Sequence, residues 1–140
     1  MKTSAKRKLG RRPRRDEEPR RVARHRYQWV IDNLCVEPSF FQRPMFGAMA
    51  CYLHGKLVLA LMAQGEEPWC GILVATERAH HKALMKEFST LRPHSVLGKW
   101  LYLPEAVELF EETANGLVER ILAGDSRIGV EAGRQRRLKI

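Results

Sequence analysis

The sequence has no apolar run long enough to cross a membrane. A spanning helix needs about 20 mostly apolar residues, and no stretch of this chain approaches that length. The basic residues at the start lead into more arginine and no hydrophobic segment, a pattern that does not fit a secretory signal. We therefore expect a cytoplasmic protein with no membrane partner.

Cysteine is also scarce, with three residues and no C-x-x-C pair. An odd number at wide spacing, each within an apolar stretch, does not fit a disulfide framework. We expect Cys35, Cys51 and Cys70 to act as small buried hydrophobic side chains.

Motifs of catalysis and metal binding are missing. The histidines form no H-x-x-x-H or H-E-x-x-H pattern, and adjacent His80 and His81 would point about 100° apart on a helix. There is no G-x-S-x-G, and the glycines are too scattered for a phosphate loop. A site assembled in space from Cys70, His80 and a carboxylate stays open, although hydrogen-bonded or solvated histidines fit better. The sequence therefore predicts a non-enzymatic protein with no cofactor.

The charge is divided unevenly along the chain. Of the 140 residues, 44% are apolar and 29% charged, which suits one domain with a buried core. Residues 1–26 hold twelve Lys/Arg and three Asp/Glu, a net charge of +9, while residues 27–133 hold nine and thirteen, a net charge of −4. Four more basic residues follow in 134–140. The pattern indicates a mildly acidic globule with basic extensions.

The first nineteen residues have almost nothing to bury, since Leu9 is their only large apolar residue. Such a segment cannot offset the entropy of ordering its chain, so we expect disorder. The predicted division is a disordered basic arm at 1–19, a folded domain at 20–124 and a basic tail at 125–140.

The apolar pattern predicts an α+β fold. Residues recurring at three- and four-residue steps indicate helices, and two apolar runs around His54-Gly55 are typical of a β-hairpin. Strands joined by tight turns form an antiparallel meander, against which the helices would pack. The expected helices span about 20–34, 77–88 and 105 or 106 to just before Gly124, and the expected strands span 48–53, 56–63, 69–75 and 100–103, with a loop at 37–43 and a short extended piece at 95–97.

One core is expected to join these elements. We expect five large side chains to be buried together: Phe46, Leu59, Leu73, Trp100 and Phe110.

One stretch around the expected hairpin has Arg43, Met45, Phe46 and Gly47, followed by Tyr52, Gly55 and Lys56. The stretch resembles the "R-x-M-F-G … Y … G-K" signature of TfoX N-terminal domains, and the related MmcQ/YjbR-like proteins share the layout. The resemblance implies an α+β fold similar to type III secretion chaperones and a non-enzymatic link to competence regulation. The same residues are also typical of a packing motif at the start of a strand.

The basic arm is the feature with a specific electrostatic meaning. Seven of the ten residues from Lys6 to Arg15 are basic, and such an arm can neutralise phosphates and release their counterions. A solvated terminus without a partner, or a start codon assigned too early, remains the alternative. The candidate nucleic-acid residues are Lys6, Arg7, Lys8, Arg11, Arg12, Arg14, Arg15, Arg20 and Arg21.

Three functional hypotheses follow. The first is a TfoX-like regulatory domain whose arm contacts nucleic acid or an acidic protein. The second is a small-molecule-binding or enzymatic domain with a pocket between the sheet and the helix at 77–88. The third is a chaperone-like protein-interaction module that uses the sheet face.

Overall fold

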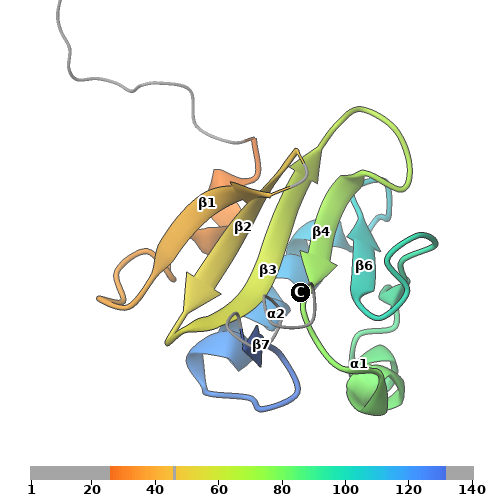
Figure 1. Cartoon of the computed structure of the whole chain (residues 1–140). Coiled ribbons are helices and arrows are strands. Elements are labelled where there is room, and N and C mark those ends of the chain that lie inside the picture. Colours follow the sequence, from red (N-terminus) through yellow and green to blue (C-terminus); the bar gives the residue numbers. More distant parts are fainter. Residues whose placement is uncertain (1–25, 46, 132–140) are drawn as a thin grey trace, which may run out of the picture.

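The computed structural model describes residues 26–45 and 47–131, and these form one α+β domain (Figure 1). An antiparallel sheet carries helices on one side, as the sequence predicts. The elements are η2 (Gln28–Ile31), β1 (Phe41–Met45), β2 (Ala48–Leu53), β3 (Lys56–Ala63), β4 (Cys70–Val74), η3 (Arg78–His80), α1 (His81–Glu87), β5 (Arg92–Pro93), β6 (Leu101–Pro104), α2 (Phe110–Leu122) and β7 (Val130–Glu131).

The strand order is β1-β2-β3-β4-β6-β5, and β7 pairs with the start of β3. The hairpin of β2 and β3 has the predicted bounds. Its turn places His54 at φ 53° and Gly55 at φ 79°, and positive φ at both central residues suits the twist of a two-residue hairpin. This local turn chemistry explains why the hairpin was predictable.

Strand β1 is a correction, because the sequence predicted a loop at 37–43. The strand forms one edge of the sheet, drawn in orange in Figure 1, and its last residue Met45 pairs with Ala48 of β2. No residue of β1 is fully buried, so the strand lacks the apolar run that marks β2 and β3. Pro44 is tolerated because an edge strand need not donate every backbone hydrogen bond.

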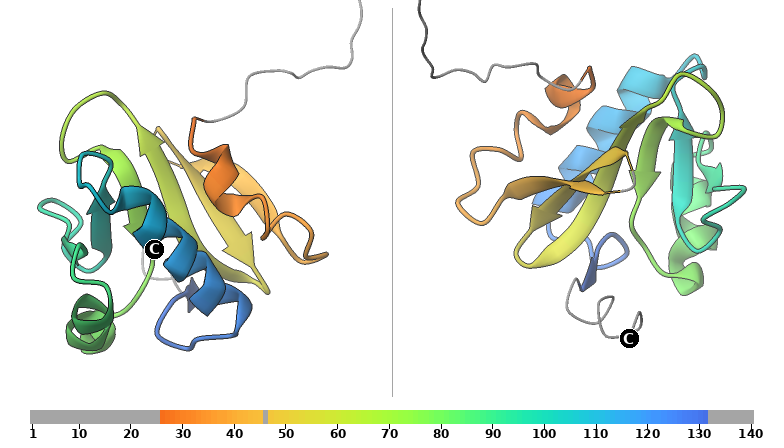
Figure 2. Two further views of the ribbon diagram at one scale, coloured as in Figure 1. Left: turned by 180° about the vertical axis from the view of Figure 1, so that it is seen from behind. Right: turned by 45° about the horizontal axis from the view of Figure 1, so that its top comes forward.

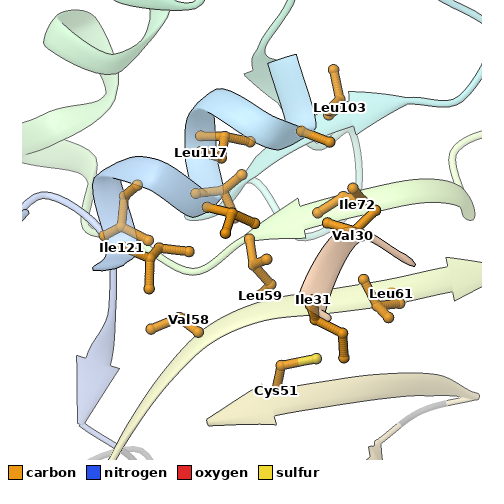
Figure 3. Close-up of a cluster of buried hydrophobic side chains, with 14 of the residues drawn as sticks. Val30, Ile31, Cys51, Val58, Leu59, Leu61, Ile72, Leu103, Leu117 and Ile121 are labelled. Atoms are coloured by element: carbon orange, nitrogen blue, oxygen red, sulfur yellow. The ribbon is translucent and has the colours of Figure 1, made fainter. Parts of the chain in front are cut away.

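Helices α2 and η2 cover one face of the sheet, the face that the left view of Figure 2 turns toward the reader. Helix α2 places Leu117 and Ile121 against β3, β4 and β6, and Val30 and Ile31 of η2 complete the cluster (Figure 3). The helix begins at Phe110, later than predicted, because 104–110 form two successive turns in which the N–H groups of Val107 and Phe110 donate to carbonyls three residues earlier. Gly124 follows its end at φ 80°, in the predicted left-handed position.

The opposite face carries a second apolar cluster, so the predicted single core is wrong. Leu59 and Phe110 belong to the first cluster, whereas Leu73 and Trp100 belong to the second. Successive side chains of a strand point to opposite faces, and a run that is buried on both faces does not reveal which residue joins which cluster. Phe46 lies outside the described residues.

The predicted helix at 20–34 is also corrected. Within 26–34 the chain forms only η2, followed by turns, although Tyr27 and Leu34 are buried as the stripe predicts. The helix predicted at 77–88 is confirmed, since η3 runs directly into α1. The extended piece near 95–97 is absent, and β5 pairs with β6 instead.

The fold continues past Gly124 to Glu131. Arg127 forms ion pairs with Asp125 and Glu87, both at 2.6 Å. Ile128 is buried, and the next residue donates a backbone hydrogen bond to Ala75. Within 26–45 and 47–131, no helix is long and apolar enough to cross a membrane.

Candidate nucleic-acid interface

Most residues of the predicted motif lie on the first two hairpins. Arg43 and Met45 are on β1, and Tyr52 is on β2. Gly47 and Gly55 occupy turns at opposite ends of β2, and Lys56 is the exposed first residue of β3. The structure therefore brings Arg43 and Tyr52 together but separates the two glycines. The basic residues from Lys6 to Arg21 and Phe46 lie outside the described residues.

Arg43 and Tyr52 form a cluster with Phe41, which the sequence analysis did not single out. Phe41 pairs with Tyr52 across β1 and β2, and their rings are stacked with centroids 4.6 Å apart and planes within 3°. The guanidinium carbon of Arg43 lies 5.1 Å from the centroid of the Tyr52 ring. We call Phe41, Arg43 and Tyr52 the β1 cluster.

The members of the β1 cluster differ sharply in exposure. Tyr52 is 4% exposed, whereas Phe41 is 46% exposed and Arg43 is also exposed. Stacking and cation–π contacts of this kind hold side chains in place. The buried Tyr52 side chain therefore holds in place the accessible ring of Phe41 and the accessible guanidinium of Arg43.

Two polar contacts fix β1 from its flanks. The Ser39 hydroxyl accepts a hydrogen bond from the His54 backbone N–H at 3.0 Å. The Gln42 and Gln28 side-chain amides pair reciprocally at 3.3 and 3.4 Å. Because Gln28 is two residues from Arg26, this amide pair joins β1 to the point where the basic N-terminal segment enters the fold.

A second network, also missed by the sequence analysis, holds that entry point. Arg26 pairs with Glu105 at 2.6 Å, and the Cys70 thiol donates to the other oxygen of Glu105 at 3.2 Å. The hydroxyl of Tyr27 lies 3.6 Å from the Cys70 sulfur. The hydrogen bond from Cys70, followed by those from Tyr27 and Arg26, lowers the pKa of Glu105, while burial raises the pKa of Tyr27. The carboxylate thus stays ionised and holds Arg26, the first residue that the structure describes.

The two buried histidines form structural hydrogen bonds, as the sequence favoured. His94 is 2% exposed, accepts from the Val96 and Leu97 N–H groups through Nδ1 and contacts the Pro68 carbonyl through Nε2 at 2.7 Å. His81 contacts the Lys99 carbonyl in the same way.

A site built from Cys70, His80 and a carboxylate, which the sequence left open, is not found among the described residues. The two residues lie at opposite ends of β4 and the segment that follows it. No group of three His, Cys, Asp or Glu side chains in 26–45 and 47–131 could hold a metal ion.

The expectation for the cysteines is met only in part. Cys51 is fully buried, and burial raises the pKa of its thiol to about 12. Cys35 is exposed and Cys70 is partly buried, so those two predictions are corrected.

Charge separates two parts of the folded domain. Residues 38–65, which contain β1, β2 and β3, include Arg43 and Lys56 but no Asp or Glu. Residues 105–131 hold seven acidic and two basic residues. A polyanion is therefore favoured at the β1 side and repelled from the side of α2.

A hollow of about 480 Å³ lies between the end of α1 and α2, on the acidic side of the domain. Phe88 and Leu109 give it apolar walls, and Glu112 and Glu119 line its rim. The Thr90 and Thr113 hydroxyls hydrogen-bond to each other within it at 2.9 Å. This differs from the place between sheet and helix that the sequence suggested for a small-molecule pocket, and its carboxylates do not suit an anion.

No protein-family model, no curated protein and no solved structure matches this chain.

Proposed function

We propose that this protein is a non-enzymatic, TfoX-like regulatory domain that binds nucleic acid through its basic N-terminal arm and the adjacent edge of its sheet. The observation that carries the proposal is the reciprocal Gln28–Gln42 amide pair. It joins the root of a segment with net charge +9 to the strand that presents Arg43. The family resemblance agrees with a regulatory role.

The physical basis of binding is phosphate neutralisation. Each Lys or Arg that meets a phosphate releases condensed counterions, and the affinity falls as the salt concentration rises. Residues 38–65 contain no carboxylate that would repel a phosphate, and they include the exposed cation Arg43. Affinity from such contacts alone is about micromolar or weaker at physiological salt.

The test is a titration of labelled duplex DNA at two salt concentrations. Wild type should bind at low salt and lose affinity steeply at high salt. The variant with Arg11, Arg12, Arg14 and Arg15 changed to Ala should bind at least tenfold more weakly.

A matched control removes four exposed cations elsewhere, so both variants lose the same net charge. This control should retain most of the affinity. Equal binding by wild type and the arm variant, or no binding by wild type at low salt, would refute the proposal. The control changes Lys82, Lys86, Arg92 and Lys99 to Ala.

A further inference from the structure

We infer that the β1 cluster is a base-stacking site, so that this domain binds single-stranded nucleic acid more tightly than a duplex. The inference rests on the proposed function and names its ligand class. It follows from the position of Phe41 and Arg43 on an edge strand, with Tyr52 stacked against them.

Phe41 provides the stacking surface. Phe41 is 46% exposed, although Tyr52, on which its ring is stacked, is almost completely buried. A ring held against Tyr52 loses little freedom when a base stacks on its accessible side. Aromatic side chains of this kind bind every base, because every base has a π face.

Arg43 provides the matching charge. Its guanidinium contacts the Tyr52 ring and forms no ion pair with any other described residue. A guanidinium next to a stacked base can contact the neighbouring phosphate with two N–H groups. Ring and cation together therefore match one nucleotide unit, a base and its phosphate.

The geometry favours a single strand over a duplex. In a duplex the base faces are covered by their neighbours, whereas an unpaired strand can turn its bases onto an aromatic ring. Phe41 and Arg43 lie on the edge strand β1. The described elements near them include no long helix that could enter a major groove.

Another use of the edge, the addition of a further β-strand, fits less well. Pro44 is the fourth of the five residues of β1 and cannot donate a backbone hydrogen bond. Proline and charged residues on an edge strand are devices that prevent strand pairing with a second chain. The exposed side chains of β1 are thus better suited to a ligand than its backbone is.

The experiment compares four probes by fluorescence anisotropy at low salt: a labelled twelve-nucleotide oligo-dT, the same length of RNA, an abasic strand with equal phosphates and a duplex. Wild type should bind the two base-containing single strands about tenfold more tightly than the abasic strand, on the scale of one stacked base. The Phe41→Ala variant should lose this preference while keeping its affinity for the abasic strand. Arg43→Gln should weaken binding to every single strand, the abasic strand included, by the same factor. This factor should be smaller than tenfold.

Controls keep the result interpretable if Phe41→Ala is poorly folded. Phe41→Tyr retains an aromatic ring and should bind like wild type, whereas Phe41→Leu retains apolar bulk and should bind like the alanine variant. Val96→Ala removes an exposed apolar side chain from the loop between β5 and β6 and should change nothing.

Equal affinity of wild type for the oligo-dT and abasic strands, or of Phe41→Leu and wild type for oligo-dT, would overturn the inference. If arm-dependent duplex binding persists in that case, the proposed function survives and only the stacking site fails. If wild type binds none of the probes, both fail.

Discussion

The hairpin region at 38–65 and the C-terminal region at 105–131 differ in charge and in the exposure of their aromatic side chains. The first has no carboxylate and places an exposed ring and a cation on an edge strand. The second is acidic and contributes α2, whose apolar stripe covers the sheet. The accessible aromatic ring, Phe41, and the buried aromatic ring that stabilises the fold, Phe110, therefore lie on different elements.

The two phenylalanines Phe41 and Phe110 give the sharpest test of this division. Phe110 is 7% exposed and contacts Tyr27 and Trp29 at ring-centroid distances of 5.5 and 6.2 Å. Phe110→Ala should lower the free energy of unfolding by about 3–5 kcal/mol. Phe41→Ala should lower it by only about 1 kcal/mol, the scale of one aromatic pair.

Urea unfolding followed by circular dichroism measures both values. If the two truncations cost the same, the ring of Phe41 has a structural role and the contrast between the regions disappears.

The turn of the first hairpin is expected to tolerate change less well than its strand. Gly47 lies at φ 76°, and a Cβ there would meet Nε2 of Gln64 at 2.9 Å. Gly47→Ala should therefore cost about 1–2 kcal/mol, mainly from the left-handed backbone, since the end of a glutamine side chain can move. Gly47→Asn should cost less, because asparagine tolerates this conformation. Thermal unfolding of both variants measures the difference, and an alanine variant as stable as wild type would contradict it.

Acid should act on the C-terminal region and not on the hairpins. Hydrogen bonds from Arg127, at 3.0 Å from Nε and 2.6 Å from Nη2, lower the pKa of Asp125 to about 2. Because this folded-state pKa is depressed, the ionised carboxylate stabilises the fold above the ordinary pKa of aspartate, near 4. That contribution is lost as the pH falls from about 4 to 2.

Asp125→Asn should accordingly destabilise the protein at pH 7 by about 1 kcal/mol, the net value of a hydrogen bond to a charged group at a partly exposed site. The difference from wild type should vanish near pH 2. Urea midpoints measured from pH 7 to 2 provide the check, with Glu111→Gln as a surface control. A difference that persists unchanged at pH 2 would show that Asp125 acts through its shape and not through its charge.

The predictable part of the fold was set by local chemistry. The His54-Gly55 turn and the apolar runs beside it determine the hairpin of β2 and β3. Strand β1 was missed because its residues are half exposed and give no apolar period. The division of core residues between two faces was missed because both faces of β3 and β4 are buried.

The candidate site was predictable only in part. Arg43 and Tyr52 stood out through the family resemblance, but Phe41 did not. A signal did exist, since a two-residue turn after Met45 would place Phe41 opposite Tyr52, as the register has it. The Cys70–Glu105 contact joins residues 35 positions apart, and no local pattern could have revealed it.

The most direct test of the central claim is an NMR titration of the full-length protein with oligo-dT. The account predicts that amide shifts in the folded domain concentrate on β1 and β2, around Phe41, Arg43 and Tyr52, while α2 stays unchanged. Shifts that concentrate on α2 and the acidic hollow beside it, or that spare β1, would contradict it.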